Sequence, residues 1–432
     1  MELIIDLHLH SHYSRATSPQ MNTEDLYYWG KIKGINVLGT GDFTHPQYFS
    51  ELREKLEPAE PGLFKLKDEF AKEKDANLPK NIRDQLFRFV LTVEISNIYS
   101  KNGKVRKMHN LIVAPSLEVA AELNERLARI GNLKADGRPI LGLDSKELLR
   151  ICLEISKEIL FIPAHIWTPW FSIFGSKSGF DTIKEAFEDL TPEIKIVETG
   201  LSSDPFMNWR LSQLDGLTII SNSDAHSPNK LGREANVLDT NLDYQSITGT
   251  FKSNNQSFLG TIEFFPEEGR YHYDGHRLCG TCFSPAETKE LKGICPKCGK
   301  PLVIGVDYRV EELADRAGDY KPVQHKQVEY IIPLVEILAE IQGVKSGNAT
   351  SVKKNYQKII AALGSEFAIL RSIPVNAIKD AGFTELAEAI TRMRKGDVHV
   401  QPGYDGVYGQ IKLFNNSSAV VKSIAGQFNI GL

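Results

Sequence analysis

The chain has 432 residues, of which 41% are hydrophobic and 25% are charged, the balance of a water-soluble globular protein with more than one domain. Its formal net charge of −4 excludes the global basic field of a protein that coats nucleic acid, although a local basic groove stays open. No apolar run reaches the roughly 18 residues that a membrane span needs, and the first residues lack the basic segment of a signal peptide. We therefore expect a cytoplasmic protein without a membrane partner.

Short apolar runs alternate with helical stretches through the first half of the chain. Helical segments fit between most of the runs, for example over Leu117–Ile130 and Ser145–Lys157. Alternating strands and helices predict a parallel sheet or a barrel, hence the α/β class. The expected strands are Leu3–Leu7, Ile35–Thr40, Phe87–Val93, Leu111–Ala114, Ile159–Pro163, Ile194–Val197 and Leu217–Ser221.

One connection differs from this alternation. Asn102-Gly103 is a strong hairpin signal between the third and fourth runs. A turn centred there would place Ser96 opposite His109, with Glu94 diagonal to His109 on the same face. Local geometry would then bring a carboxylate and an imidazole together. The charged stretch Pro46–Arg83, by contrast, is predicted to be an insertion after a strand end.

Two boundaries divide the rest of the chain. We expect a first domain over residues 1–268, a cysteine module over 269–306 and a mainly helical domain over 307–432. In the last of these, Tyr330–Ile341 is predicted to be an apolar helix. A second helix is marked by apolar residues at helical spacing, namely Val352, Tyr356, Ile359, Ile360 and Leu363.

Residues that ligate metals gather where the predicted strands end. In a β/α barrel these ends converge on one mouth, so the side chains are expected to meet. Several imidazoles with several carboxylates suit Zn²⁺, Mn²⁺ or Fe²⁺, and more than one ion, with Glu94 as the bridging carboxylate. Metals a few ångströms apart can activate water against a phosphoester. Any one histidine could be structural, but the joint pattern favours a metal site formed by His8, His10, Asp42, His45, Glu94, His109, His165, Asp224 and His226.

Four of the five cysteines form a separate pattern. Cys279 and Cys282 are separated by two residues, as are Cys295 and Cys298, with twelve residues between the pairs. This spacing predicts a structural zinc ribbon with four cysteine ligands, which supports a module too small for its own core. Nearby lysines could touch phosphates or form a solvated face. Cys152 is expected to be a buried hydrophobic residue, and the neighbouring histidines, His272 and His276, are left structural.

An aromatic loop follows His165. Its residues 166–179 include Trp167, Trp170 and Phe171, which could stack on a base or simply cover the barrel mouth. Weaker candidates for DNA or base contacts are Ser202 and the tyrosines of a glycine-rich stretch near the C-terminus, Tyr404 and Tyr408.

The strand-end motifs are also a family signature. DLHLHSHYS, GTGDFTH, TVEIS, HNLIV, PAH and SDAH resemble, in this order, those of the PHP (polymerase and histidinol phosphatase) superfamily over about the first 265 residues. The resemblance implies a distorted seven-stranded PHP barrel with two to three Zn²⁺, Mn²⁺ or Mg²⁺ ions. It assigns His8, His10, Glu94 and Asp224 to one metal, Glu94, His109 and His165 to a second, and His226 to a third. Asp224, Glu94 and His226 would be the catalytic residues.

The order of the modules narrows the resemblance from the superfamily to one family within it. A PHP domain followed by a four-cysteine module and a tail ending in QPGYDGVYG resembles the endonuclease Q family. This implies cleavage of double-stranded DNA on the 5′ side of deaminated bases (uracil, hypoxanthine, xanthine) and abasic sites. The protein partner to expect for such an enzyme is a sliding clamp or a helicase.

Two departures from the superfamily pattern concern the third metal. The second motif usually reads Asp-His, whereas here Asp42 is followed by Phe43, with His45 as a displaced substitute. A ligand that usually follows the first histidine pair is missing, and His12 or Asp42 could compensate. Two other functions stay open: a small-molecule phosphatase of the same superfamily, and a non-catalytic DNA-binding module.

Overall fold

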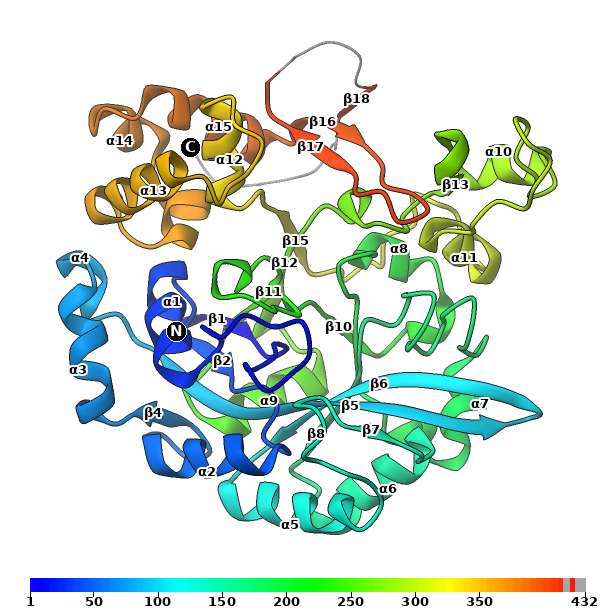
Figure 1. Cartoon of the computed structure of the whole chain (residues 1–432), viewed down its shortest axis with the longest axis horizontal. Helices are drawn as coiled ribbons and strands as arrows, with labels where there is room; N and C mark the ends of the chain where they lie inside the picture. The colour runs from blue at the N-terminus through cyan, green and yellow to red at the C-terminus, as the bar shows by residue number, and fades with distance from the viewer. Residues whose placement is uncertain (415–419, 424–432) are drawn as a thin grey trace.

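The computed structural model describes residues 1–414 and 420–423. In this part of the chain, seven strands surround a common interior as a distorted α/β barrel (Figure 1). In spatial order they are β1 (Glu2–Asp6), β2 (Val37–Gly39), β5 (Arg88–Lys101), β6 (Lys104–Ala114), β8 (Leu160–Pro163), β9 (Ile196–Glu198) and β10 (Thr218–Ile220). A parallel bridge between Leu9 and Ala225 links the segments after β10 and β1, so the barrel closes just beyond its strands. The predicted α/β barrel is confirmed, and each predicted strand is present.

The barrel interior is filled by one apolar cluster, with residues from all seven strands. Alternate residues of a strand share a face, so Val90 on β5 points inward together with Glu94 four residues later. The same alternation aligns Val113 and Leu111 of β6 with His109. Helix α9 (Tyr244–Ser253) closes the interior through Tyr244, Ile247 and Phe251. The polar side chains of these strands therefore lie at one end of the barrel, beyond its apolar interior.

Strands β5 and β6 form the predicted hairpin, which projects from the barrel as a long two-stranded arm (Figure 1). Asn102 and Gly103 occupy its turn with φ of 54° and 73°, as a two-residue turn of this kind requires. Ser96 pairs with His109, and this is the register that the turn predicted.

Helices and short strands surround this barrel. Around the first half lie α1 (Thr23–Lys33), α5 (Leu117–Ala128), α6 (Ser145–Ile155), α7 (Ile183–Phe187) and α8 (Pro205–Trp209). The predicted insertion contains α2 (Pro46–Lys55), β3 (Leu56–Pro58), β4 (Phe64–Leu66), α3 (Asp68–Asn77) and α4 (Lys80–Arg83). Strands β7 (Ile140–Leu141), β11 (Ala235–Asp239) and β12 (Phe258–Glu263) extend the sheet. No helix in the described ranges is long and apolar enough to cross a membrane.

The cysteine module lies beside the barrel (Figure 1). It contains a small hairpin of β13 (Asp274–His276) and β14 (Thr281–Phe283), followed by α10 (Pro285–Glu290), and α11 (Val306–Leu313) packs against it. Among its described residues, the last part of the chain has four α-helices above the barrel: α12 (Leu334–Ile341), α13 (Thr350–Leu363), α14 (Val375–Asp380) and α15 (Thr384–Lys395). Strands β16 (Asp397–Gln401), β17 (Gln410–Lys412) and β18 (Val420–Ser423) form a separate sheet.

One predicted helix begins later than expected. The helix over Tyr330–Ile341 begins at Leu334, because Pro333 at its start disfavours helical backbone in the preceding residue. Tyr330 instead ends β15 (Gln327–Tyr330), which pairs in parallel with β12 and attaches the C-terminal part to the barrel sheet. The apolar run therefore serves two elements.

Candidate metal centre

The strand ends gather the predicted ligands at the barrel mouth by turning sharply as they leave the sheet. Asp42, His165 and Asp224 have φ of 49°, 31° and 44°, a region that residues with a side chain seldom adopt. Such strain is concentrated at functional sites. The turn at His165 also requires Gly200 (φ 71°), where an added Cβ would lie 2.3 Å from the Cβ of His165. Glycine is the residue that this approach tolerates.

The carboxylate of Glu94 lies at the centre of the site. Its Oε1 is 2.6 Å from His109 Nδ1 and 2.9 Å from His165 Nε2. On the other side, Oε1 is 3.5 Å from His8 Nε2, and Oε2 is 3.3 Å from His10 Nε2. Four imidazoles, which follow or lie on β1, β6 and β8, therefore face one buried carboxylate. This is the arrangement that a bridging ligand between two metals requires.

The ligand atoms form three overlapping groups, within each of which they lie no more than 4.8 Å apart. One group is His8, His10 and Glu94; a second is Glu94, His109 and His165; the third is His10, Asp224 and His226. These are the residues that the family resemblance assigned to three metals, with Asp224 in the third group rather than the first.

Several buried atoms at the centre lack the contacts that polar atoms need. His8 Nε2, His10 Nε2 and Asp224 Oδ1 form no hydrogen bond within the described residues, although His10 Nε2 and Asp224 Oδ1 are only 3.2 Å apart. A buried polar atom without a partner costs free energy. A cation among these atoms would satisfy all of them, so the residues present fit a metal site.

Two carboxylates and one imidazole of the site, Glu94, Asp224 and His109, are in the states that bind a cation. Burial would raise the pKa of Glu94, but His109, Arg138 and His8 hold it well below its ordinary value. Burial would likewise raise the pKa of Asp224, but the nearby imidazoles of His10 and His8 lower it instead. Burial lowers the pKa of His109 to about 4, against the pull of Glu94. Both carboxylates are thus ionised and His109 is neutral near pH 7, the states in which they bind metal.

Access to the site is one-sided. The side chains of His8, His10 and Glu94 are fully buried, whereas those of Asp224 and His226 are 28% and 33% exposed. A substrate can therefore approach from the Asp224 and His226 side, which carries the third group.

Two residues absent from the predicted set support the centre. Glu198, the last residue of β9, accepts hydrogen bonds from His8 Nδ1 at 3.0 Å and from the backbone N–H of His165 at 2.9 Å. A carboxylate in this position fixes the ring that presents Nε2 to a metal. Glu198 ends a strand as the other ligands do, so the same rule could have found it. Arg138 donates to Glu94 Oε2 at 3.0 Å from a loop without any sequence signal.

Asp42 and His45 lie outside the three groups. Asp42 is 3.2 Å from His10 Nδ1 and accepts hydrogen bonds from the side chains of Ser11 and Ser14. Its carboxylate therefore orients His10 from behind, as Glu198 orients His8. His45 stacks on Tyr13 with ring centroids 4.2 Å apart, at the start of α2.

The predicted base-contact residues divide into buried and exposed. Trp167 is only 1% exposed and donates a hydrogen bond to Asn208. Of the two roles considered for this residue, the structure shows the second, in which Trp167 is part of the core that covers the barrel. Phe171 lies over His109 with ring centroids 4.6 Å apart, and Trp170 is 44% exposed. Tyr408 is 68% exposed.

Two weaker candidates occupy less open positions. Ser202 lies against Gly269, where an added Cβ would be 3.3 Å from the serine hydroxyl. Tyr404 packs its ring against Gly275 of the cysteine module, so it joins the module to the C-terminal loop.

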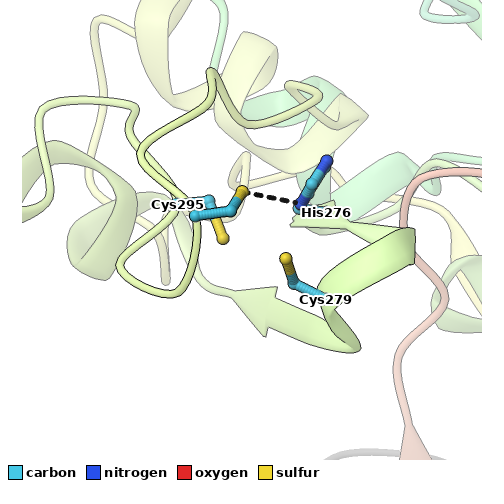
Figure 2. Close-up of side chains that lie close together, drawn as sticks. His276, Cys279 and Cys295 are labelled. Atoms are coloured by element: carbon cyan, nitrogen blue, oxygen red, sulfur yellow. Dashed lines mark hydrogen bonds between the residues drawn. The ribbon is translucent and has the colours of Figure 1, made fainter.

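The cysteine cluster differs from the predicted set by one residue. Cys279, Cys295 and Cys298 come together as expected, but the fourth member of the group is His276 and not Cys282. Figure 2 shows His276, Cys279 and Cys295 close together. Cys152 is buried, as predicted for a hydrophobic position.

The whole chain resembles solved structures of one kind. It superposes on the lesion-specific endonuclease PfuEndoQ from Pyrococcus furiosus with a TM-score of 0.81 and 30% identity, covering 95% of both chains. The chain belongs to the endonuclease Q family. It matches equally well, with a TM-score of 0.81 and 30% identity over 95% of this chain and 96% of the other, an endonuclease Q in complex with a 27-mer duplex that carries an abasic lesion at the active site.

Sequence comparisons place two further proteins near this member of the endonuclease Q family. YqxK of Bacillus subtilis is 28% identical over 88% of this chain and 89% of its own. MJ0043 of Methanocaldococcus jannaschii is 31% identical over 57% of this chain, and the match spans only 31% of that longer protein. The family described as the MJ0043 C-terminal domain matches residues 333–397, which contain the helices α12 to α15.

Proposed function

We propose that this protein is a metal-dependent endonuclease that cuts damaged double-stranded DNA. The proposed cleavage is hydrolysis of the phosphodiester on the 5′ side of deaminated bases (uracil, hypoxanthine, xanthine) and abasic sites. The observation that carries the proposal is the Glu94 carboxylate, which faces four imidazoles at one barrel mouth. The family adds the substrate class, since one relative holds a duplex with an abasic lesion at its active site.

The residues of the site divide the work of hydrolysis. His8, His10, Glu94, His109, His165, Asp224 and His226 would hold the metals. Two or three such ions, when bound, would supply an activated water and would stabilise the charge that develops on the phosphate. In the hydrolysis the water oxygen forms a bond to phosphorus as the ester P–O bond breaks. The water's proton passes to solvent or to an ionised carboxylate, and the departing sugar oxygen takes a proton from solvent. Asp224 and His226, on the open side of the site, are placed to meet the phosphodiester.

Arg138 is a cation of this chain that adjoins the metal groups directly. It lies 3.0 Å from Glu94 and is 29% exposed at its side chain. A guanidinium in such a place can stabilise a phosphate oxygen as negative charge develops on it. It also keeps Glu94 ionised, so Arg138 has both a positioning and a substrate-facing role.

A row of exposed and half-buried aromatic and cationic side chains begins next to Phe171, which lies against His109. We name Trp170, Tyr271, Arg270 and Tyr408 the aromatic ridge. Trp170 and Tyr271 meet edge to face at 6.3 Å, and the Arg270 guanidinium lies 5.0 Å from the centre of the Tyr408 ring. Stacking on aromatic rings binds bases of any sequence, and arginine binds phosphate. The ridge therefore suits DNA beside the cleaved bond.

Cleavage of defined duplexes tests the function. End-labelled duplexes with one uracil, one hypoxanthine, one abasic site or no lesion are incubated with Mg²⁺, Mn²⁺ or Zn²⁺ and the wild type, Asp224→Ala or Glu122→Ala. Glu122 is an exposed carboxylate on helix α5, outside the three ligand groups, and serves as the control. We expect a single cut 5′ of the lesion by the wild type and the control, and none by Asp224→Ala. Phosphate release from a small ester without any cut in DNA would refute the proposal.

The ridge has its own test. Trp170→Ala should weaken lesion-duplex binding about tenfold, the cost of losing one stacked base, while the cleavage rate at saturating DNA changes little. The matched control is Tyr320→Ala, because Tyr320 is an exposed aromatic that lies over Arg316 and outside the ridge. Equal weakening by both variants would show that the ridge has no special role.

A further inference from the structure

The barrel wall has a seam between β10 and β1. Strand β1 pairs with β2 and β11, whereas β10 pairs with β9, and no ladder among the described residues joins β10 to β1. Metal ligands lie on both sides of this seam, since His8 and His10 follow β1 and Asp224 and His226 follow β10. Side chains that cross the seam therefore help to set the relative position of the two ligand pairs.

Asn222, two residues after β10, crosses this seam with its side chain. Its Oδ1 accepts the backbone N–H of Leu7 at 2.8 Å, and its Nδ2 donates to Glu198 Oε1 at 2.8 Å. Asn222 and Glu198 are each only 1% exposed, so water does not compete for the bond between them. Because Leu7 directly precedes His8 and Asn222 lies two residues before Asp224, one amide joins the two ligand segments.

Asn236, on β11, fixes the orientation of that amide. Its Oδ1 accepts the backbone N–H of Ser221 at 3.1 Å, and its Nδ2 donates to Ser221 O at 2.8 Å and to Asn222 Oδ1 at 3.2 Å. A backbone donor and a backbone acceptor allow the Asn236 amide one orientation. The Asn222 oxygen then accepts from Asn236 and Leu7, so its nitrogen must face Glu198.

Glu198 passes this arrangement to the metal ligands. His8 Nδ1 lies 3.0 Å from both Glu198 oxygens, and Oε2 also accepts the backbone N–H of His165 at 2.9 Å. The Asn222 amide donates to the other oxygen, Oε1. Each oxygen of the carboxylate thus has a partner besides His8, which fixes the carboxylate and with it the ring that presents His8 Nε2 to the site.

We propose that Asn222 and Asn236, which we name the asparagine pair, are positioning residues of the metal centre. Through Glu198 the pair orients the His8 ring, and across the seam it holds the segment that leads to Asp224. Partners of this kind, one step behind the ligands, typically change metal affinity by about 10- to 100-fold. The inference rests on the proposed metal-dependent function, but it concerns the affinity for metal and not the choice of DNA.

The chain offers a matched control at the other end of β1. Asn36 Oδ1 accepts the backbone N–H of Ile4 at 2.8 Å, and its Nδ2 donates to Leu86 O at 3.3 Å. Asn36 and Leu86 precede β2 and β5, so this amide joins strands at the end of the barrel away from the ligands. Asn36→Asp therefore disturbs an amide of the same kind on the same strand without disturbing the metal centre.

Mn²⁺ binding measures the effect without DNA. Metal-depleted full-length protein is titrated with Mn²⁺, and free Mn²⁺ is followed by electron paramagnetic resonance; thiolates bind this ion poorly, so the cysteine module does not contribute. Asn222→Asp places a second buried carboxylate against Glu198 and should weaken Mn²⁺ binding about 100-fold. Asn36→Asp should bind Mn²⁺ as the wild type does, even if its melting temperature falls.

A double variant separates positioning from general damage. In Asn222→Asp with Glu198→Gln the net charge is restored, and the hydrogen bond can re-form in reverse. The introduced amide donates to residue 222 where Oε1 accepted, and its oxygen still accepts from His8 and from the backbone of His165. We expect the double variant to bind Mn²⁺ no more weakly than Glu198→Gln alone, whereas independent effects would multiply.

A variant without new charge keeps the proposal testable if Asn222→Asp does not fold. Asn236→Ala removes the bond that orients Asn222 and should weaken Mn²⁺ binding about tenfold, with the fold checked by circular dichroism. Multiplied effects in the double variant, an equal loss in Asn36→Asp, or an unchanged Mn²⁺ affinity in Asn236→Ala would each overturn the proposal. Since no DNA enters the measurement, failure of the proposed substrate would leave these results unaltered.

Discussion

The barrel mouth and the cysteine module both gather metal ligands, but they hold them in different ways. At the mouth, ligands leave separate strands whose positions are fixed by the apolar interior of the barrel. In the module, the clustered residues lie on two short loops beside a hairpin with three residues in each strand. Few buried apolar residues, such as Leu302 and Val306, lie nearby. The core builds the first site without the help of a metal. We expect the second to depend on a bound metal for its own structure.

This difference predicts different consequences of disruption: chemistry should fail at the mouth, and local folding should fail in the module. The largest effect is expected from Glu94→Gln. Loss of the shared negative charge should lower the cleavage rate by about 10³-fold. The metals would lose the carboxylate that bridges them, and the transition state at the phosphate would be less stabilised. Single-turnover cleavage of an abasic duplex measures the rate, and circular dichroism checks that the barrel remains folded. A rate within tenfold of wild type would show that Glu94 does not bridge metals.

Metal removal should separate the two regions directly. A strong chelator should abolish activity, which divalent ions restore, and should also expose residues 276–303 to protease while the barrel strands stay protected. Limited proteolysis followed by mass spectrometry locates the cuts. Cleavage spread evenly over the barrel and the module would contradict the comparison, since it would mean that the barrel too depends on metal for its fold.

A smaller effect is expected from substituting a residue that orients a ligand without belonging to the ligand groups. Glu198→Gln should weaken metal binding at the mouth about 10- to 100-fold, because His8 loses the carboxylate that orients its ring. Titration of activity with Mn²⁺ measures the shift, and saturating Mn²⁺ should restore most of the rate. The exposed Glu122→Gln variant should titrate as wild type does. If no concentration of metal restores the Glu198→Gln rate, Glu198 has a role beyond positioning.

The smallest effect concerns a buried acid beside the barrel mouth. Burial raises the pKa of Glu263 from 4.5 to about 8, although Ser221 donates to it. A carboxyl with a raised pKa favours the folded state below its unfolded pKa, and this contribution is lost as the pH rises from 4.5 through about 8. Glu263→Gln cannot ionise, so its melting temperature relative to wild type should rise between pH 5 and about pH 9. A difference that is constant with pH would show that Glu263 is not protonated in the folded protein.

Sequence patterns predicted the barrel mouth well because its causes are local. Apolar runs of strand length and the Asn102-Gly103 turn fix which residues leave strands, and in a barrel all strand ends point to one mouth. The pairing of Ser96 with His109 followed from the turn alone. Glu198 satisfied the same rule and was overlooked, whereas Arg138 comes from a loop and depends on how that loop folds over the mouth.

The cysteine module was predicted less well because its spacing is ambiguous. Cys279 and Cys282, with two residues between them, fit the usual pattern, and so do His276 and Cys279. Glycines follow Cys279 and Cys298, at 280 and 299, and this shared feature is the signal that separates the two interpretations. Trp167 illustrates a related limit, since an aromatic residue beside a ligand has the same sequence pattern whether it is buried or exposed.

Local patterns in the chain were sufficient for the α/β class, the strand order along the chain, the residues at the strand ends and the existence of a cysteine module. These follow from periodicity, turn chemistry and spacing, which act over a few residues. Packing in three dimensions was needed to place Asp42 and Glu198 behind His10 and His8, to bring Arg138 to Glu94, and to turn His276 toward the cysteines in place of Cys282. Each of these depends on which face of an element meets another, and contacts between distant segments fix that face.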